Sequence, residues 1–306
     1  MDNPSGDTQQ IKKPKISIGV PVYNEEKYIA STLDSILQQK LSNCEIIIAD
    51  NASEDKTRDI ISFYVEKYFF IRYVRHKNNI GAVQNFNFLI KESRGDYFVM
   101  VGAHDLWSGD YIEKLSEALN RRPHAVLASG LVQWINEKGE EIETNSDHPA
   151  GFVDTSGMPL YARLHQCLYM NPAAIYGMFR LDSLKKTRLA IETINTDVIL
   201  LTELSVTGEF IIVPEVTWFW RENRKVEAFE ERIARYCSVL FYKTKRPALP
   251  FCRMIFVFLT LIFYVKVKIT WKERVLLFSS YVINVILRFS SLMIYDLKKY
   301  AVFYKI

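Results

Sequence analysis

Short apolar runs rich in β-branched and aromatic residues alternate with longer, helix-like segments from residue 16 to residue 122. Four runs have the length and composition of buried strands, at residues 16–22, 45–49, 71–74 and 97–101. The segments between them carry apolar residues at the spacing of one helix face. This alternation is typical of βαβ units and predicts an α/β fold with a largely parallel sheet.

The pattern loosens after residue 122. Two further strand-like runs lie at residues 125–129 and 210–213, and helical segments are expected near 159–168 and 197–208. With 306 residues, 49% hydrophobic and 24% charged, the chain has ordinary globular composition, which excludes a disordered or fibrous protein. Its four cysteines are scattered without a CxxC pair, so we expect a reducing compartment and no structural zinc. The first 15 residues contain no apolar segment of a secretory leader, so we expect a cytoplasmic protein.

Polar residues gather directly after three of the strand-like runs. The first run ends in Pro21-Val22-Tyr23-Asn24-Glu25, the second in Asp50-Asn51-Ala52-Ser53 and the fourth in Gly102-Ala103-His104-Asp105. The carboxyl ends of parallel strands meet at one edge of a sheet, where ligands bind in open α/β folds. A carboxylate at that edge can hold a divalent cation, and the cation can hold a diphosphate. The sequence therefore predicts a diphosphate-binding site at this edge.

In this order and spacing the motifs resemble those of the family 2 glycosyltransferases of the GT-A fold. Members of that family have strand ends of the form P-x-[YF]-N-E and D-[DN]-x-S-x-D-x-T, then N-x-G-x-x-x-[AR]-N and a DxD-type motif. This chain has counterparts of all four, in register, between residues 16 and 119. The resemblance implies a GT-A-type, Rossmann-like mixed sheet flanked by helices, and inverting transfer of a sugar from a nucleotide diphosphate sugar.

The resemblance assigns the sugar donor to residues at these strand ends. Asp50 is expected to accept the imide N–H of a uracil base, which makes UDP the expected nucleotide. Asn24 and Ser53 fit helix caps as well as they fit ligand contacts. The residues expected to contact the donor are Pro21, Val22, Tyr23, Glu25, Asp50, Asn51, Asn79, Gly81, Asn85, Ala103, His104 and Arg221.

The metal-binding motif departs from the family pattern. Members read D-x-D-D where this chain has Gly102-Ala103-His104-Asp105. The alignment places Asp105 on the carboxylate that ligates Mg²⁺ or Mn²⁺, and His104 where a carboxylate usually faces the ribose. An imidazole beside a carboxylate suits Mn²⁺ better than Mg²⁺, so we expect a divalent cation held by Asp105 and His104. A neutral, hydrogen-bonding role explains His104 equally well.

The second half of the chain is expected to bind the acceptor. Asn195-Thr196-Asp197 resembles the family's [ED]-D segment at a helix start, which makes Asp197 the expected base that removes a proton from the acceptor hydroxyl. The competing interpretation is that Asp197 only caps the helix. Gly177 is expected to permit close approach of substrate, and Arg221 to steady the leaving diphosphate. The Q-x-x-R-W signature of processive polymer synthases does not occur, so we expect transfer of a single sugar.

The C-terminal residues differ from the rest. From Lys243 to Ile306 there are 12 Lys and Arg against 2 Asp and Glu, whereas the first 242 residues have 27 against 33. Uncharged runs at residues 254–265 and 275–287 are shorter than the roughly 20 residues of a membrane-spanning helix. A polar stripe marks the second run as an amphipathic helix, formed by Glu273, Ser280, Asn284, Arg288, Ser291 and Tyr295. We expect contact with an anionic membrane surface rather than nucleic acid, although packing on the protein body or a homo-oligomer contact fits the same pattern.

These predictions divide the chain into three parts. Residues 14–122 are the expected nucleotide-sugar-binding half and residues 123–225 the acceptor-binding half of one domain, followed by an amphipathic helical tail at 226–306. The expected activity is sugar transfer to a glycan or lipid-linked saccharide at the inner face of the cell membrane, in polysaccharide biosynthesis. The alternative is a catalytically impaired relative that acts as a nucleotide-binding or scaffold protein. A nucleotidyltransferase or a Rossmann dehydrogenase is excluded because no Gly-rich phosphate loop follows the first strand.

Overall fold

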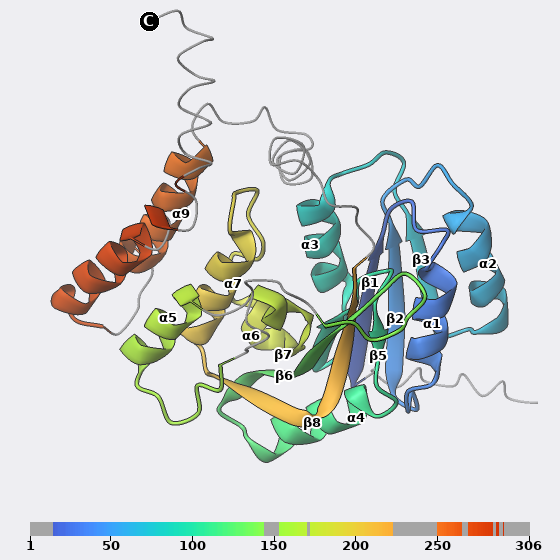
Figure 1. Cartoon of the computed structure of the whole chain (residues 1–306), viewed down its shortest axis with the longest axis horizontal. Helices are drawn as coiled ribbons and strands as arrows, with labels where there is room; N and C mark the ends of the chain where they lie inside the picture. The colour runs from blue at the N-terminus through green and yellow to red at the C-terminus, as the bar shows by residue number, and fades with distance from the viewer. Residues whose placement is uncertain are drawn as a thin grey trace, which may run out of the picture.

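The fold is built on one mixed, eight-stranded sheet (Figure 1). The computed structural model describes residues 15–143, 153–169, 172–222, 250–264, 269–283, 286–287 and 290. The strand order is β3-β2-β1-β4-β7-β6-β8-β5, formed by β1 (Ile16–Val22), β2 (Cys44–Asp50), β3 (Ile71–Arg75), β4 (Tyr97–Met100), β5 (Leu106–Trp107), β6 (Ala125–Ile135), β7 (Met178–Arg180) and β8 (Glu209–Arg221). This confirms the predicted α/β fold with a mixed sheet.

Four parallel strands carry the motifs that the sequence analysis singled out. β1 pairs with β2 and with β4, and β2 pairs with β3. The register brings Val22 opposite Asp50, so both strands end at the same edge of the sheet. Most of the side chains of β1 and β2 are buried on both faces, which explains the continuous apolar runs. The helices of this half are α1 (Ile29–Leu37), α2 (Thr57–Lys67), α3 (Ala82–Glu92) and α4 (Tyr111–Arg121).

A three-residue strand, β7, joins the two halves of the sheet. It pairs antiparallel with β4 on one side and antiparallel with β6 on the other. β6 then runs parallel to β8, whose end pairs antiparallel with β5. Backbone hydrogen bonding is therefore continuous from the donor motifs to the second half of the chain.

β6 and β8 are longer than the sequence predicted. The expected strands at 125–129 and 210–213 continue beyond a register shift between Ser129 and Leu131, after which the pairing resumes at Thr217. An irregularity of this kind breaks the alternation of side chains between the two faces. Sequence periodicity therefore located only the first part of each strand.

The loop that follows β1 also differs from its prediction. Asn24 does not cap α1, whose N-cap is Tyr28 without a side-chain hydrogen bond. Asn24 instead has a left-handed backbone with φ 54°, and its side-chain oxygen accepts the backbone N–H of Glu54 at 2.8 Å. The Ser53 hydroxyl accepts the backbone N–H of Asn24 at 3.0 Å. Both residues therefore join the loops after β1 and β2.

The second half of the chain adds α5 (Leu160–Tyr169), the 3-10 helix η1 (Pro172–Tyr176), α6 (Leu181–Lys185), α7 (Thr196–Ser205) and α9 (Pro250–Tyr264). Residues 271–283 are also helical. One hydrophobic cluster contains Leu204 of α7, Phe258 of α9 and Leu277. The C-terminal helices therefore pack on the body of the protein at the end of the molecule away from α2 (Figure 1).

Some predictions concern residues outside the described part of the chain. They are residue 14, residues 144–152, 170–171, 223–249 and 265–268, and most residues after 283, among them Asn284, Arg288, Ser291 and Tyr295 of the expected polar stripe. Among the helices that the structure describes, none combines the length and the apolar character needed to cross a bilayer.

Candidate active site

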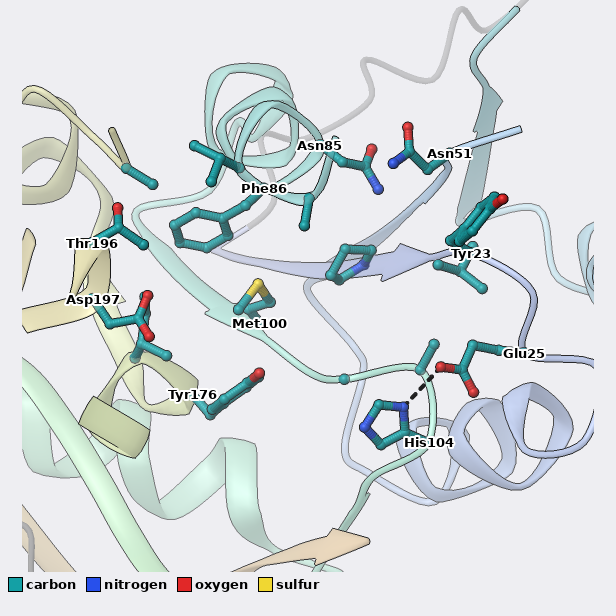
Figure 2. Close-up of a pocket in the computed structure, with 18 residues that line it drawn as sticks. Tyr23, Glu25, Asn51, Asn85, Phe86, Met100, His104, Tyr176, Thr196 and Asp197 are labelled. Atoms are coloured by element: carbon teal, nitrogen blue, oxygen red, sulfur yellow. Dashed lines mark hydrogen bonds and ion pairs between the residues drawn. The ribbon is translucent and has the colours of Figure 1, made fainter. Parts of the chain in front are cut away.

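A cavity of about 360 Å³ opens at the carboxyl edge of the parallel strands. The ends of β1, β2 and β4 and the start of α3 form one side, and η1 and the start of α7 form the other (Figure 2). Nine residues predicted from the sequence line it: Pro21, Val22, Tyr23, Glu25, Asn51, Asn85, Ala103, His104 and Asp197. The structure therefore brings predicted residues from both halves of the chain into one site.

Part of the lining was not predicted. Phe86 and Met100 form the apolar middle of the cavity, and Tyr176 and Thr196 lie near Asp197 (Figure 2). Phe86 and Thr196 are next to the predicted residues Asn85 and Asp197 in the sequence, and this adjacency was the only sequence signal for them. Met100 belongs to an apolar strand, whose pattern indicates burial and not function. Tyr176 lies within residues 170–180, whose sequence resembles the family's strand and turn on the acceptor side.

Asn79 and Gly81 lie outside the lining and shape the loop before α3. The Asn79 side-chain oxygen accepts the Asn51 amide at 2.8 Å and the backbone N–H of Gly81 at 2.8 Å. Gly81 is the N-cap of α3 and has a φ of 86°, which favours glycine. These contacts hold Asn51, which does line the cavity, in place.

Asn85 is fixed from two sides. Its side-chain amide donates to the backbone carbonyl of Ala49 at 2.8 Å, and its oxygen lies 2.9 Å from the His76 ring nitrogen Nε2. The helix start next to it therefore has a fixed position over the end of β2.

Asp50 is fully buried and does not line the cavity. Its carboxylate accepts the backbone N–H of Ser53 at 2.8 Å and the Tyr73 hydroxyl at 2.6 Å, and lies 3.4 Å from Nε of Arg75. Burial and the hydrogen bond to Asp50 raise the pKa of Tyr73. The Asp50 carboxylate is thus held by the loop after β2 and by β3, and its contact with a uracil base stays a prediction.

Glu25 and His104 form a pair on the cavity wall. Oε1 of Glu25 lies 2.9 Å from Nδ1 of His104 (Figure 2). The backbone N–H of Glu25 donates to the Thr57 hydroxyl at 2.8 Å, which anchors the loop. The pair is formed by loops that are 79 residues apart in the sequence, and it fixes the orientation of the imidazole ring.

Asp105, the next residue after His104, does not line the cavity. Its side chain is buried, Oδ1 accepts the backbone N–H of Arg221 at 3.0 Å, and desolvation raises its pKa to about 6. A Cβ atom on Gly102 would lie 2.5 Å from Oδ2 of Asp105. This contact gives a physical reason for glycine at the first position of the motif, where the family has a carboxylate.

Arg221 holds the loop that carries His104 and does not line the cavity. Its guanidinium donates to the backbone carbonyls of His104 at 2.7 Å, Asn136 at 3.0 Å and Glu137 at 2.9 Å. The guanidinium carbon lies 4.9 Å from the centre of the Tyr28 ring. In this structure the side chain that was expected to contact a diphosphate positions the loop that carries His104.

The donor atoms of His104 and Asp105 fit a divalent cation with few protein ligands. Nε2 of His104 lies 3.9 Å from Oδ1 of Asp105. A buried carboxylate whose pKa is raised by desolvation is a group that an adjacent cation would stabilise. No cluster of three or more His, Cys, Asp or Glu that could hold a metal ion occurs in the described residues. Ligand oxygens or water would therefore complete the coordination.

Asp197 occupies the first turn of α7 on the opposite side of the cavity (Figure 2). The helix has no side-chain cap hydrogen bond, so the interpretation of Asp197 as a cap is wrong. Its N-cap, Asn195, has a left-handed backbone with φ 62°. Burial raises the pKa of Asp197 to about 6 and outweighs the helix dipole, which would lower it. The carboxylate therefore lines the cavity with a pKa closer to neutral pH than that of an exposed aspartate.

Gly177 has a structural role that differs from its prediction. A Cβ atom at this position would lie 2.5 Å from the backbone oxygen of Ala128 and 2.9 Å from a methyl carbon of Leu127. The close approach that Gly177 permits is therefore to β6 and not to a substrate.

Comparison with known proteins defines the family. The family model described as Glycosyl transferase family 2 matches residues 17–186, more than half of the chain. The chain belongs to glycosyl transferase family 2. The resemblance inferred from the strand-end motifs is confirmed.

The curated relatives in this family match part of the chain. An uncharacterised glycosyltransferase of Rickettsia typhi is 29% identical over 187 residues, which cover 58% of this chain and 57% of the relative. A dolichyl N-acetyl-alpha-D-glucosaminyl phosphate 3-beta-D-2,3-diacetamido-2,3-dideoxy-beta-D-glucuronosyltransferase of Methanococcus voltae is 29% identical over 182 residues, covering 58% of this chain and 56% of the relative. The chain thus spans little more than half the length of these two glycosyltransferases.

Solved glycosyltransferases share the fold at low sequence identity. The structure of S. aureus TarS 1–349 in complex with UDP-GlcNAc has a TM-score of 0.63 at 14% identity and covers 94% of this chain and 80% of its own. The mannosyltransferase PcManGT from Pyrobaculum calidifontis, in complex with GDP-Man and Mn²⁺, has a TM-score of 0.55 at 17% identity, covering 95% and 87%. Both likenesses establish the GT-A fold of this chain.

Proposed function

We propose that this glycosyltransferase moves a single sugar from a nucleotide diphosphate sugar to a saccharide acceptor, with inversion at the anomeric carbon. One observation carries the proposal: Asp197 and the Glu25–His104 pair line opposite sides of the same cavity (Figure 2). A sugar bound between them would have a carboxylate on one side and its diphosphate on the other. Displacement in one step requires the attacking and leaving oxygens on opposite sides of the reacting carbon.

Asp197 is the proposed general base. Its carboxylate takes the proton of an acceptor hydroxyl while that oxygen forms a bond to the anomeric carbon. The bond between the anomeric carbon and the diphosphate oxygen breaks in the same step, and the nucleoside diphosphate leaves with the electron pair. A pKa of about 6 keeps Asp197 ionised near neutral pH and makes it a stronger base than an exposed aspartate.

We assign the nucleotide to the side of the cavity that carries Tyr23 and Asn51. The diphosphate would lie at the start of α3, where Ala82 and Val83 line the cavity and the backbone N–H groups of a helix N-terminus favour anions. UDP is the proposed nucleotide because the structural neighbour TarS binds UDP and UDP-GlcNAc. Asp50 is then a residue that shapes this side of the site.

A divalent cation, Mn²⁺ or Mg²⁺, would be held by His104 and Asp105. When bound, such an ion offsets the negative charge that develops on a leaving diphosphate. The structural neighbour PcManGT carries Mn²⁺ together with GDP-Man, which supports this assignment. Glu25 orients the His104 ring, and Arg221 holds the loop that carries both candidate ligands.

The proposed acceptor is a glycan or a lipid-linked saccharide at the cytoplasmic face of a membrane. The Methanococcus voltae relative is named for a dolichyl-linked sugar phosphate as its acceptor. The C-terminal helices of this chain expose large apolar side chains, among them Phe256 and Trp271, in a region of basic sequence. Exposed apolar groups flanked by basic residues favour an anionic lipid surface.

Ligand-induced thermal stabilisation tests the donor assignment. UDP should raise the melting temperature of the protein more than GDP does, and Mn²⁺ should increase the shift, because a ligand that binds only the folded state stabilises it. Release of UDP from a panel of UDP-sugars then measures turnover. The Asp197→Asn variant should keep the UDP-induced shift and lose about 10²–10⁴-fold in turnover.

Asp182→Asn is the matched control, since Asp182 also lies in the first turn of a helix in the same half of the chain but is exposed. It should behave as the wild type. UDP binding without turnover, or turnover that Asp197→Asn leaves unchanged, would reject the proposed reaction and favour the nucleotide-binding scaffold.

A further inference from the structure

The helix that carries the proposed base shares a hydrophobic core with the C-terminal helices. Nine of the ten residues of α7 are buried, all except Asp197, and α5 and η1 pack directly on the helix. One hydrophobic cluster contains Leu201 and Leu204 of α7 together with Phe258 and Leu261 of α9. Leu277, from the helical residues 271–283, belongs to the same cluster. We call α9 and residues 271–283 the C-terminal pair.

Polar contacts link the C-terminal pair to the C-terminal end of α7. The Arg188 guanidinium donates to the buried Glu203 carboxylate of α7 at 3.1 Å and to the Thr260 hydroxyl of α9 at 3.0 Å. Within the C-terminal pair, Tyr281 is buried and stacks on Phe258 with the ring centres 3.6 Å apart. A displacement of the C-terminal pair would therefore act on α7 through Glu203 and through the shared hydrophobic cluster.

The outer face of the C-terminal pair is apolar. In the second helix, Trp271 is 70% exposed and Leu287, after the helical stretch 271–283, is 77% exposed, with Leu276 and Ile283 between them also exposed. Phe256 of α9 is 64% exposed. Of the polar stripe expected from the sequence, Glu273 and Ser280 are only half-exposed, whereas Lys272 and Ser279 are exposed beside the apolar side chains.

An anionic bilayer is the partner that fits this face. Monomeric proteins rarely expose several large apolar side chains in one stripe. Trp beside aliphatic residues is typical of groups that lie at the level of lipid headgroups. The excess of 12 Lys and Arg over 2 Asp and Glu from Lys243 onward favours anionic lipid and disfavours a second copy of the same basic region.

We infer that an anionic bilayer stabilises the base-bearing helix as well as anchoring the protein. The same two helices present their outer face to lipid and hold α7 with their inner face. A bilayer that binds the assembled C-terminal pair therefore shifts the protein toward the state in which α7 is held in place. This inference relies on the proposed function only for the role of Asp197, and its test does not need a sugar donor.

The test uses the full chain with vesicles of phosphatidylcholine containing phosphatidylglycerol, compared with vesicles of phosphatidylcholine alone. The protein should sediment with the anionic vesicles. Amide hydrogen exchange in residues 196–205 should then slow about tenfold at a lipid concentration ten times the dissociation constant. Exchange in α2, at the other end of the molecule, should not change.

Two sets of variants separate anchoring from stabilisation. Leu276→Ser with Ile283→Ser should abolish sedimentation, whereas Phe69→Ser, which removes a 97% exposed aromatic side chain from the other end of the protein, should not. Thr260→Val should keep vesicle binding but reduce the protection of α7, and Thr260→Ser, which keeps the hydroxyl, should restore it. Failure to sediment would overturn the partner, and sedimentation without slower exchange in α7 would overturn the coupling. Loss of turnover with both results intact would concern the proposed reaction alone.

Discussion

Burial disfavours the ionised form of the Asp197 carboxylate, and this affects how the rate of the proposed reaction depends on pH. A general base works only in its ionised form, and the pKa of Asp197 is raised to about 6. We therefore expect the turnover rate to fall about tenfold per pH unit below pH 6 and to be level above it. A profile of kcat/KM between pH 4.5 and pH 8 measures this. A rate that stays level down to pH 5 would contradict the assignment of Asp197 as the base.

The same pKa predicts that Asp197 lowers the stability of the fold. The folded pKa lies above the usual value of 3.8, so the ionised form is disfavoured in the folded state. The loss of stability is complete above pH 6 and disappears as the pH falls below 4. Asp197→Asn should thus raise the free energy of unfolding at pH 7 by about 1 kcal/mol, a value reduced for the partial exposure of the side chain.

Urea unfolding at pH 7 and pH 4 measures the effect. The gain should be present at pH 7 and absent at pH 4, and Asp182→Asn, on the surface, should change neither value. A variant that is less stable at pH 7 would show that the carboxylate stabilises the fold after all.

Gly102 provides a test of why this chain lacks the family carboxylate. Gly102→Asp restores the residue that the family has, but its Cβ atom would lie 2.5 Å from Oδ2 of Asp105. We expect a loss of about 1–3 kcal/mol in the free energy of unfolding and no gain in Mn²⁺ affinity, measured by urea unfolding and metal titration. Gly109→Asp is the control, because a Cβ atom there meets nothing within 4 Å. A stable Gly102→Asp variant with tighter Mn²⁺ binding would refute this explanation.

At the scale of elements, the three-residue strand β7 is the only hydrogen-bonded link between the parallel strands and the second half of the sheet that the structure describes. Only three residues connect the parallel strands to the second half, and Gly177, just before them, packs on the backbone of β6. Gly177→Ala should therefore destabilise the protein by about 1–3 kcal/mol, whereas Gly109→Ala should be nearly neutral. Thermal unfolding of the two variants measures the difference. Equal melting temperatures would mean that β7 can shift to accept a methyl group.

Elements with a regular pattern were predictable from the sequence, and irregular ones were not. β1, β2, β3 and β4 were found because strands buried on both faces give continuous apolar runs. β5, with two residues, is too short to give a pattern, and the outer parts of β6 and β8 follow a register shift. The predicted C-terminal helices exist, but packing against α7 determines which face of them is exposed.

The candidate site shows a similar division at the level of single residues. Strand-end motifs identified seven of the nine predicted lining residues, because the carboxyl ends of parallel strands must meet at one edge. The other two, Asn85 and Asp197, lie in the first turns of α3 and α7. The orientation of each side chain depends on partners that are distant in sequence. Asp50 faces Tyr73, and Arg221 faces the His104 loop, so both lie outside the cavity although their positions in the sequence suggested otherwise.

Across the whole molecule, one continuous sheet predicts one cooperative unfolding transition for the part of the chain that contains it. β4, β7 and β6 are hydrogen-bonded neighbours, so neither half can unfold without exposing the edge of the other. Urea unfolding followed by tryptophan fluorescence should coincide with unfolding followed by circular dichroism, since Trp107, Trp134, Trp218 and Trp220 all lie in the second half of the sheet. Two separate midpoints would show that the halves unfold independently.

The apolar outer face of the C-terminal helices also affects how the protein must be handled. In water without lipid or detergent, side chains such as Leu287 and Trp271 can be covered only when molecules associate with one another. Aggregation should therefore increase with protein concentration and decrease when mild detergent is added. The aggregation of the purified protein is thus a measure of whether this outer face is covered.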